Sequence, residues 1–233
     1  MKNLKPRPTP PDYESNIKPI WMKPEGLSPY SIMVATPVHS DVSIQCSHLL
    51  FVDSDIDFKA SSIFKMLEKD KDIICIPYPL KTMMWDKGMD SIKKGSIKTE
   101  DDLKRSMNTY PMRVENPNDI IIDDGVIEVT HSPTGCMLIK RKVIQDMIKH
   151  YPDKGIVQKT VLNGKYVEKP NLWNFFDCLH DPETKTYLGE DFAFCKLWKD
   201  IGGKCHAYIK DDIWHIGEHQ YMGKFADELI NNK

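Results

Sequence analysis

The sequence predicts one α/β domain in which a mixed, mostly parallel β-sheet is flanked by helices. The main observation is the β-α-β alternation of residues 48–80, which is typical of parallel sheets. The segment "HLLFV" at 48–52 is apolar on both faces of an extended chain, as expected for a strand that is covered on both sides. A length of 233 residues, 40% of them hydrophobic and 28% charged, suits one soluble domain with a core.

The elements follow from local patterns along the chain. Prolines crowd residues 1–30, and because proline blocks helices and strand pairing, we expect an extended arm there. The domain then covers residues 31–225, and residues 226–233 form a C-terminal tail. The expected elements are strands at 31–38 and 48–52, a helix within 59–71, a strand at 72–80, a helix near 90–107, a strand, turn, strand and helix over 126–152, a long connection over 152–188, a helix at 190–203 and a strand at 204–210.

Charge and composition exclude several classes of partner. A formal net charge of −2 gives no argument for binding nucleic acid or an anionic membrane surface. The chain has no run of about 18 apolar residues and no apolar leader, so we expect neither a membrane span nor a signal peptide. Six cysteines form no CxxC pair, which favours a reducing compartment. We therefore expect a cytoplasmic protein, in the host cytoplasm if the source is viral.

Three carboxylates at alternating positions end the apolar strand. Asp53, Asp55 and Asp57 follow "HLLFV" directly, and residues two apart on an extended chain face the same side. Their mutual repulsion calls for a cation or a proton among them. Acidic residues that only end a strand as turn formers and helix caps are the simplest alternative, but this alternative does not account for the alternation.

Two other readings of these aspartates can be weighed from the sequence. An EF-hand calcium loop requires glycine at its sixth position and glutamate at its twelfth, where this chain has Phe58 and Phe64, so we reject it. A haloacid-dehalogenase-like phosphatase would use Asp53 as nucleophile, with a later acidic pair in "IIIDDG" at 120–125. That reading remains as a less favoured alternative.

The favoured reading is a divalent metal site with a DxD motif. Strand-end carboxylates hold Mn²⁺ or Mg²⁺, hard cations suited to oxygen ligands, and the metal bridges the diphosphate of a nucleotide-sugar. Downstream, Glu190 and Asp191 begin a helix, where carboxylates also occur simply because they are stabilised there. His215 and His219 lie four residues apart among glycines, which raises the odds that one of them is a metal ligand.

Taken in order along the chain, these motifs resemble one family. They are "ATP" (35–37), "LLFVDSDIDF" (49–58), "YPLKTMMW" (78–85), "SPTGCMLIKR" (132–141), "LGEDFAFCKLW" (188–198) and "HIGEHQYMG" (215–223). The resemblance is to the GT-A glycosyltransferases of large DNA viruses and phages, of the chlorovirus capsid-glycan type, and it covers residues 31–225. It implies a GT-A, Rossmann-like sheet, a divalent metal, a nucleotide-sugar donor and a glycan or other acceptor hydroxyl.

The resemblance also assigns roles to residues. Asp191 would be the general base and Glu190 would position the acceptor. The implied metal ligands are Asp53, Asp55 and His215; the implied donor-binding residues are Thr36, Pro37, Ser54, Thr134 and Gly135; the acceptor or pocket residues are Tyr78, Lys81, Trp85 and His219.

One departure from the family concerns the first half of the fold. Only residues 39–47 separate the strand at 31–38 from the one at 48–52, where such enzymes have a helix, a strand and a second helix. One wall of the nucleotide pocket should therefore be thin. The leading hypothesis is a metal-dependent, inverting glycosyltransferase; the alternative is a degenerate family member that binds a glycan or a partner without turnover.

Overall fold

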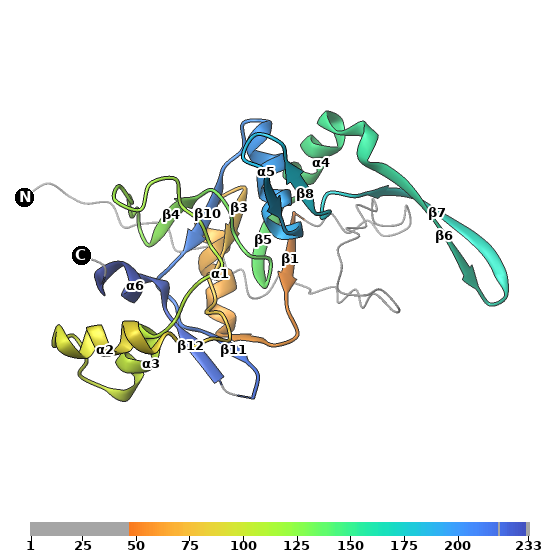
Figure 1. Cartoon of the computed structure of the whole chain (residues 1–233). Helices are drawn as coiled ribbons and strands as arrows, with labels where there is room; N and C mark the ends of the chain where they lie inside the picture. Colours follow the sequence, from red (N-terminus) through yellow and green to blue (C-terminus); the bar gives the residue numbers. More distant parts are fainter. Residues whose placement is uncertain (1–46, 219, 232–233) are drawn as a thin grey trace, which may run out of the picture.

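The computed structural model describes residues 47–218 and 220–231. A five-stranded sheet forms the centre of the molecule (Figure 1). Its strands, in spatial order, are β1 (His48–Val52), β5 (Cys136–Lys140), β3 (Ile73–Cys75), β10 (Cys205–Tyr208) and β4 (Val126–Val129). The three middle strands are almost entirely buried because their residues are apolar on both faces.

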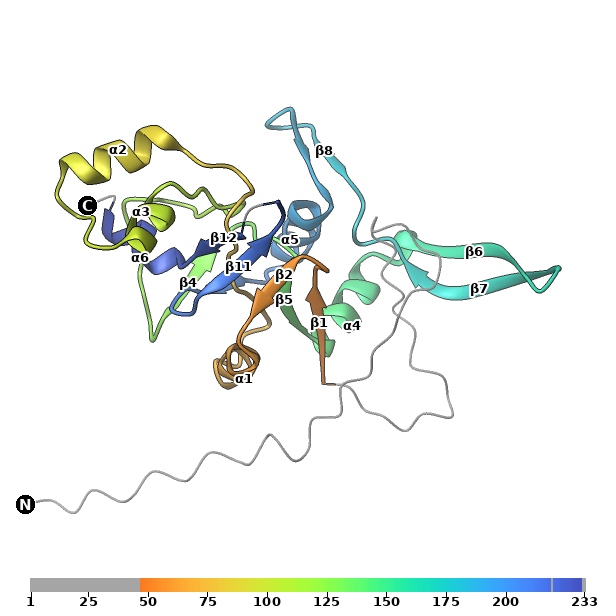
Figure 2. The ribbon, with the colours of Figure 1, turned by 90° about the horizontal axis from the view of Figure 1, so that it is seen from below.

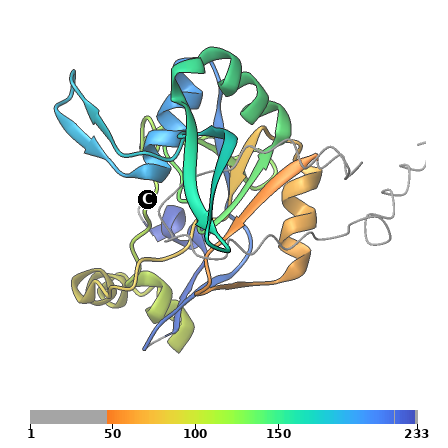
Figure 3. The same ribbon diagram turned by 90° about the vertical axis from the view of Figure 1, so that its right-hand side faces the viewer.

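Helices cover both faces of this sheet, as Figure 3 shows. On one face α1 (Ala60–Glu68) contributes Met66, and with it Ile63 and Leu67, to a core that includes Ile74 and Leu138. On the other face lie α4 (Arg141–His150) and α5 (Glu190–Asp200). Each helix presents apolar side chains at helical spacing to the sheet, which is the arrangement expected of an α/β domain.

The remaining elements surround this centre. A second sheet has the order β12 (Gln220–Gly223), β11 (Ile213–Ile216), β2 (Ile56–Phe58). The other elements are α2 (Trp85–Lys93), α3 (Glu100–Ser106), a 3-10 turn η1 (Pro152–Lys154), the hairpin β6 (Gly155–Leu162) and β7 (Lys165–Trp173), the hairpin β8 (Leu179–Asp181) and β9 (Thr186–Leu188), and α6 (Phe225–Asn231).

The expectation of a mostly parallel sheet is wrong. Among the described strands of this sheet, only β3 and β10 pair in parallel, whereas the β1–β5, β3–β5 and β10–β4 pairs are antiparallel. The β-α-β unit formed by β1, α1 and β3 is present, and its two strands point the same way. However, β5 is inserted between them and runs in the opposite direction. A fully buried strand such as β5 has the same apolar pattern in either direction, so its sequence did not reveal the insertion.

Two expected regions without regular structure contain elements. The long connection at 152–188 contains both hairpins. The β6–β7 turn is Asn163-Gly164, with positive φ at both residues, and Asn-Gly between alternating residues is a strong hairpin signal that could have been used. Helix α6 covers residues expected to form the C-terminal tail, and its Phe225 and Leu229 pack against the core.

Some expectations fall on residues outside the described part of the chain. These are the proline-rich arm at 1–30, the strand at 31–38 and the shortened link at 39–46. Within the residues that the structure describes, no helix has the length and apolar character needed to cross a membrane.

Candidate functional site

Three strands of the main sheet bring the predicted residues together at one end of the strands. Asp53 follows β1, Tyr78 lies just beyond β3, and Gly135 directly precedes the antiparallel β5. The Asp53 N–H donates to the Gly135 carbonyl at 3.0 Å, which fixes the start of the DxD segment to the turn before β5. The sheet topology therefore gathers these residues although they are up to 82 positions apart (135 − 53).

His215 faces Asp55 across a short gap. Pairing of β11 with β2 sets His215 opposite Ile56, and the Ile216 N–H donates to the Asp55 carbonyl at 2.7 Å. The Nδ1 atom of His215 lies 2.9 Å from the Pro79 carbonyl oxygen. Because a carbonyl can only accept a hydrogen bond, we infer that Nδ1 carries the hydrogen. His215 is thus part of β11.

This tautomer leaves two acceptor atoms face to face. The Nε2 atom of His215 lies 3.3 Å from Oδ2 of Asp55. In a neutral ring with the hydrogen on Nδ1, Nε2 bears only a lone pair. A lone pair and a carboxylate oxygen at this distance repel each other unless a proton or a cation lies between them. A proton on Nε2 would make this contact an ion pair, and a cation would make the two atoms a pair of metal ligands.

The geometry around Asp55 fits Mg²⁺ or Mn²⁺ in part. Octahedral coordination at about 2.1 Å puts neighbouring ligand atoms about 3 Å apart, close to the observed 3.3 Å. Among the described residues, no three His, Cys, Asp or Glu side chains form a complete metal site. Mg²⁺ is commonly held by one or two carboxylates together with substrate phosphates and water, so a two-ligand protein site suits a metal that is completed by a diphosphate.

Lys81 currently neutralises the same carboxylate oxygen. Its Nζ lies 2.7 Å from Oδ2 of Asp55, and this hydrogen bond holds the pKa of Asp55 below its usual value. The lysine stem runs beside Gly217, where a Cβ would lie 3.2 Å from Cδ of Lys81. An ammonium group thus occupies the position next to Asp55 where a divalent cation would have to bind.

Asp53 is electrostatically different from Asp55. Desolvation by the surrounding protein raises the pKa of Asp53, and the neighbouring Asp55 carboxylate raises it further, while His215 partly opposes both. Glu190 also contributes to the higher pKa. A nearby cation would therefore favour the ionised form of Asp53, because positive charge would offset the repulsion by its acidic neighbours.

Asp191 lies at the N-terminus of α5 and belongs to the same cluster. Burial raises its pKa to about 6, although the Phe192 N–H, which donates to Oδ1 at 2.8 Å, acts in the opposite direction. The charges of Glu190 and Asp53 raise it further. A carboxylate with a pKa near 6 is a stronger base than an ordinary aspartate, yet it is ionised at neutral pH, as a general base requires.

Tyr78 and Gly135 form the floor between these acidic groups. The Tyr78 ring meets the His215 ring edge-on, with centroids 5.0 Å apart. A Cβ on Gly135 would lie 2.4 Å from Cε1 of Tyr78 and 2.9 Å from Oδ2 of Asp53. Burial and the charge of Asp53 raise the pKa of Tyr78 far above its usual value, so its phenol stays protonated.

Other predicted residues lie at the rim or away from the site. Ser54 is exposed in the turn between the two aspartates, and Thr134 is half-buried in the turn before β5. Trp85 begins α2 and is 67% exposed; among the described residues its indole forms no hydrogen bond or ring contact. The predicted residues Thr36, Pro37 and His219 lie outside the described part of the chain.

Sequence reasoning missed the backbone component of the site. The Pro79 carbonyl sets the tautomer of His215, and outer partners of this kind usually orient metal-binding histidines. A carbonyl group leaves no trace in residue type, so no sequence pattern could have identified it.

The acidic pair required by the phosphatase reading is far from Asp53. Asp123 and Asp124 precede β4, which is at the opposite end of the sheet order from β1. Four strand spacings separate the two edge strands, about 19 Å at ~4.8 Å each. Asp124 is moreover ion-paired with Lys69 and Lys210. These positions do not favour a shared phosphatase centre.

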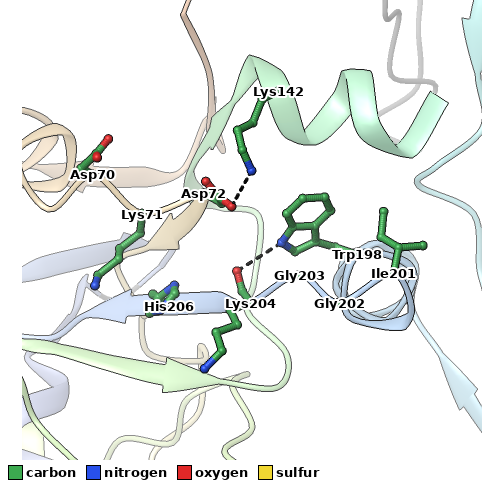
Figure 4. Close-up of a pocket in the computed structure, with 10 residues that line it drawn as sticks. All are labelled: Asp70, Lys71, Asp72, Lys142, Trp198, Ile201, Gly202, Gly203, Lys204 and His206. Carbon is green, nitrogen blue, oxygen red and sulfur yellow. Dashed lines mark hydrogen bonds and ion pairs between the residues drawn. The ribbon is translucent and has the colours of Figure 1, made fainter. Parts of the chain in front are cut away.

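A cavity of about 380 Å³ lies at the opposite ends of the strands of the main sheet (Figure 4). Its cationic side chains are largely paired: Lys142 with Asp72 at 2.8 Å, and Lys204 with Glu128 at 2.8 Å. Trp198 is 4% exposed, and its Nε1–H donates to the Lys204 carbonyl. Lys71 also lines the cavity and has no ion pair among the described residues, but the buried Trp198 offers no open aromatic face to a ligand.

Comparisons with known proteins give little support for any assignment. The chain matches no protein-family model and no curated protein. One solved structure, described as "Crystal Structure of A197 from STIV", is similar with a TM-score of 0.35 and 16% sequence identity, over 74% of this chain and 59% of that chain. The chain thus spans less than two thirds of that protein's length, and a likeness of this size bears on neither fold nor function.

Proposed function

We propose that this protein is a metal-dependent glycosyltransferase that moves a sugar from a nucleotide-sugar donor to an acceptor hydroxyl with inversion at the sugar C1. The observation that carries the proposal is the close approach of His215 Nε2 and Asp55 Oδ2, two potential metal ligands 3.3 Å apart. A cation between them resolves their repulsion. The raised pKa of Asp191, in the same cluster, adds a base of suitable strength.

In this mechanism the chain's own residues bind, orient and move a proton. Asp55 and His215 would hold Mn²⁺ or Mg²⁺, assisted by Asp53. The ion would supply positive charge to the diphosphate leaving group. The carboxylate of Asp191 accepts the proton of the acceptor hydroxyl as the acceptor oxygen forms its bond to C1, and the bond from C1 to the diphosphate oxygen breaks with its electron pair. Lys81, released from Asp55, can pair with a phosphate oxygen.

The test is a screen for donor hydrolysis and transfer across nucleotide-sugars in the presence of Mn²⁺. Asp191→Asn should lower turnover by about 10²–10⁴-fold, the usual contribution of general base catalysis, with donor binding nearly intact. Asp55→Asn should abolish the dependence on Mn²⁺. The matched control is Asp57→Asn, because Asp57 is exposed on β2 opposite Trp214. Equal activity of all three variants would refute the proposal.

A second candidate is a binding protein without turnover. The Lys81–Asp55 ion pair favours it, because the carboxylate is already neutralised without a metal. In that case, a glycan would bind equally well with Mn²⁺ or with a chelator, and Asp191→Asn would leave binding unchanged. Detection of a transferred sugar by mass spectrometry would exclude this candidate.

A further inference from the structure

Among the residues that the structure describes, the guanidinium group of Arg113 forms no ion pair and no hydrogen bond. Its neighbours Met112 and Val114 pack against the core, so the alternation of an extended chain directs Arg113 outward, where it is exposed. The backbone of Arg113 is nevertheless fixed, because its N–H donates to the His131 carbonyl at 3.1 Å and its carbonyl accepts from the Thr130 N–H at 2.8 Å. Arg113 is therefore held at its backbone while its charge stays available to a ligand.

An aromatic ring sets the position of this guanidinium group. Its central carbon lies 5.2 Å from the centroid of the Phe192 ring, within the range of a cation–π contact. The His131 ring also packs against Phe192, with centroids 4.8 Å apart. A guanidinium group that stacks on an aromatic ring keeps its N–H groups at the edge, where two of them can bind the oxygens of one carboxylate or phosphate. The stack therefore reduces the conformational freedom that Arg113 would lose on binding an anion.

The charges around this stack leave a positive excess. Burial and three nearby cations together lower the pKa of the His131 ring to about 4, so the ring is neutral at pH 7. The cations are Arg113, Lys199 and Lys196. Two of them are paired with carboxylates, Lys196 at 2.9 Å and Lys199 at 3.6 Å. Of the three, Arg113 alone has no carboxylate partner in the described part of the chain, so the surface favours an anion.

The stack lies beside the candidate site. Phe192 belongs to the first turn of α5, where the β8–β9 hairpin joins the helix (Figure 2). It directly follows Asp191, and its N–H donates to Oδ1 of Asp191 at 2.8 Å. His131 lies four positions before Gly135 in the floor of the site (135 − 131), and four residues of fully extended chain span at most about 14 Å. Arg113 is therefore within reach of an acceptor molecule whose hydroxyl group meets Asp191.

We propose that Arg113 binds an anionic group of the acceptor, a carboxylate or a phosphate, so that the acceptor is an acidic sugar or a sugar phosphate. Two N–H groups at the edge of the guanidinium then donate to two oxygens of the anion. The proposal rests on the glycosyltransferase function proposed above, because Asp191 as the base is what makes the neighbouring surface an acceptor site. It gives a binding role to a residue that belongs to none of the motifs found in the sequence.

Titrations followed by ligand-observed NMR test this proposal with three probes: glucuronate, glucose 6-phosphate and glucose, each added to the full chain with Mn²⁺. At least one anionic probe should bind at least about tenfold more tightly than glucose, because hydrogen bonds to charged groups are the stronger ones. Tighter binding of glucuronate identifies a carboxylate, and tighter binding of glucose 6-phosphate identifies a phosphate. High salt should weaken the binding of the anionic probes and leave that of glucose unchanged.

Two variants and a control assign the preference to Arg113. Arg113→Met keeps an apolar stem beside Phe192 and should abolish the preference for the anionic probe, whereas Arg113→Lys keeps the charge without the fork and should retain part of it. Lys98→Met removes an exposed lysine that has no ion pair among the described residues, and it should change nothing.

Failure of this proposal and failure of the transferase give different results. Equal binding of the three probes, no binding of any probe, or an unchanged preference in Arg113→Met each overturns the role of Arg113. A preference that Arg113→Met abolishes supports the anion site even if no nucleotide-sugar supports transfer, because binding requires no turnover. A chain that transfers sugar equally well to acidic and neutral acceptors remains a transferase and overturns the role of Arg113 alone.

Discussion

Three aspartates of the candidate site differ in pKa because their surroundings differ. A hydrogen bond from Lys81 lowers the pKa of Asp55, whereas desolvation raises the pKa of Asp53 and raises that of Asp191 to about 6. Pairs of acidic groups whose environments separate their pKa values are typical of sites that divide roles between them. Here the ionised Asp55 suits cation binding, and the more basic Asp191 suits proton transfer.

At the residue scale, Asp191→Asn should stabilise the protein at neutral pH. An aspartate whose pKa is higher in the folded state binds its proton more tightly there, so stability is lost as pH rises from about 4 to about 6. Removing the charge abolishes that loss. We expect the unfolding free energy to rise by about 1–2 kcal/mol above pH 7 and not to change near pH 3. This gain is smaller than the free energy equivalent to the whole pKa shift, because the side chain is partly solvated.

Urea denaturation at several pH values measures this effect. The control is Asp57→Asn, whose side chain is exposed and should not change the pH dependence. A loss of stability in Asp191→Asn at pH 8 would mean that the carboxylate acts mainly as a favourable charge at the start of α5.

Also at the residue scale, Lys81→Met should strengthen Mn²⁺ binding. Because the Lys81 ammonium lies 2.7 Å from Asp55, an entering cation must displace it. Pairs as exposed as this one contribute at most about 1 kcal/mol, so the gain in affinity should be about two- to fivefold by calorimetry. Lys87→Met, which breaks the pair with Glu228 away from the site, should change nothing. Weaker Mn²⁺ binding in Lys81→Met would show that the two cations do not compete.

At the scale of elements, the turn before β5 limits what can occupy the floor of the site. Gly135→Ala places a Cβ 2.4 Å from the Tyr78 ring, which must move away from His215. We expect a loss of about 1–3 kcal/mol in unfolding free energy from overpacking, together with weaker Mn²⁺ binding by calorimetry. Gly189→Ser is the comparison, because its Cβ meets nothing closer than 3.6 Å and serine is a favoured N-cap. Wild-type behaviour of Gly135→Ala in both measurements would contradict this account.

The elements also show what the sequence could and could not predict. β1, α1, α5 and β10 lie within their expected ranges, because each combines an apolar pattern with clear end signals. The direction of β5 and the pairing of β4 with β10 depend on contacts between distant segments, which periodicity does not encode. The closeness of Asp53, Asp191 and His215 likewise arises only when β1, α5 and β11 are assembled. Their roles in metal binding and catalysis stay predictions.

At the scale of the whole molecule, formal charge is distributed unevenly along the chain. The formal charge of −2 for the chain is the sum of +2 in residues 155–173 and −4 in the remainder. Residues 115–124 alone carry −4, although Glu115 is paired with Lys199, and Asp124 with Lys69 and Lys210. Net charge therefore hid this separation, because the two contributions partly cancel.

The central position of β10 also affects how the chain folds during synthesis. β3 ends at residue 75 and its parallel partner β10 begins at residue 205, so 130 residues must be added before the sheet can close (205 − 75). At about 5–20 residues per second, this delay is about 7–26 s. During it, β3 and β4 lack their common neighbour and expose apolar strand edges. Until β10 has been made, these exposed strand edges favour aggregation of the nascent chain.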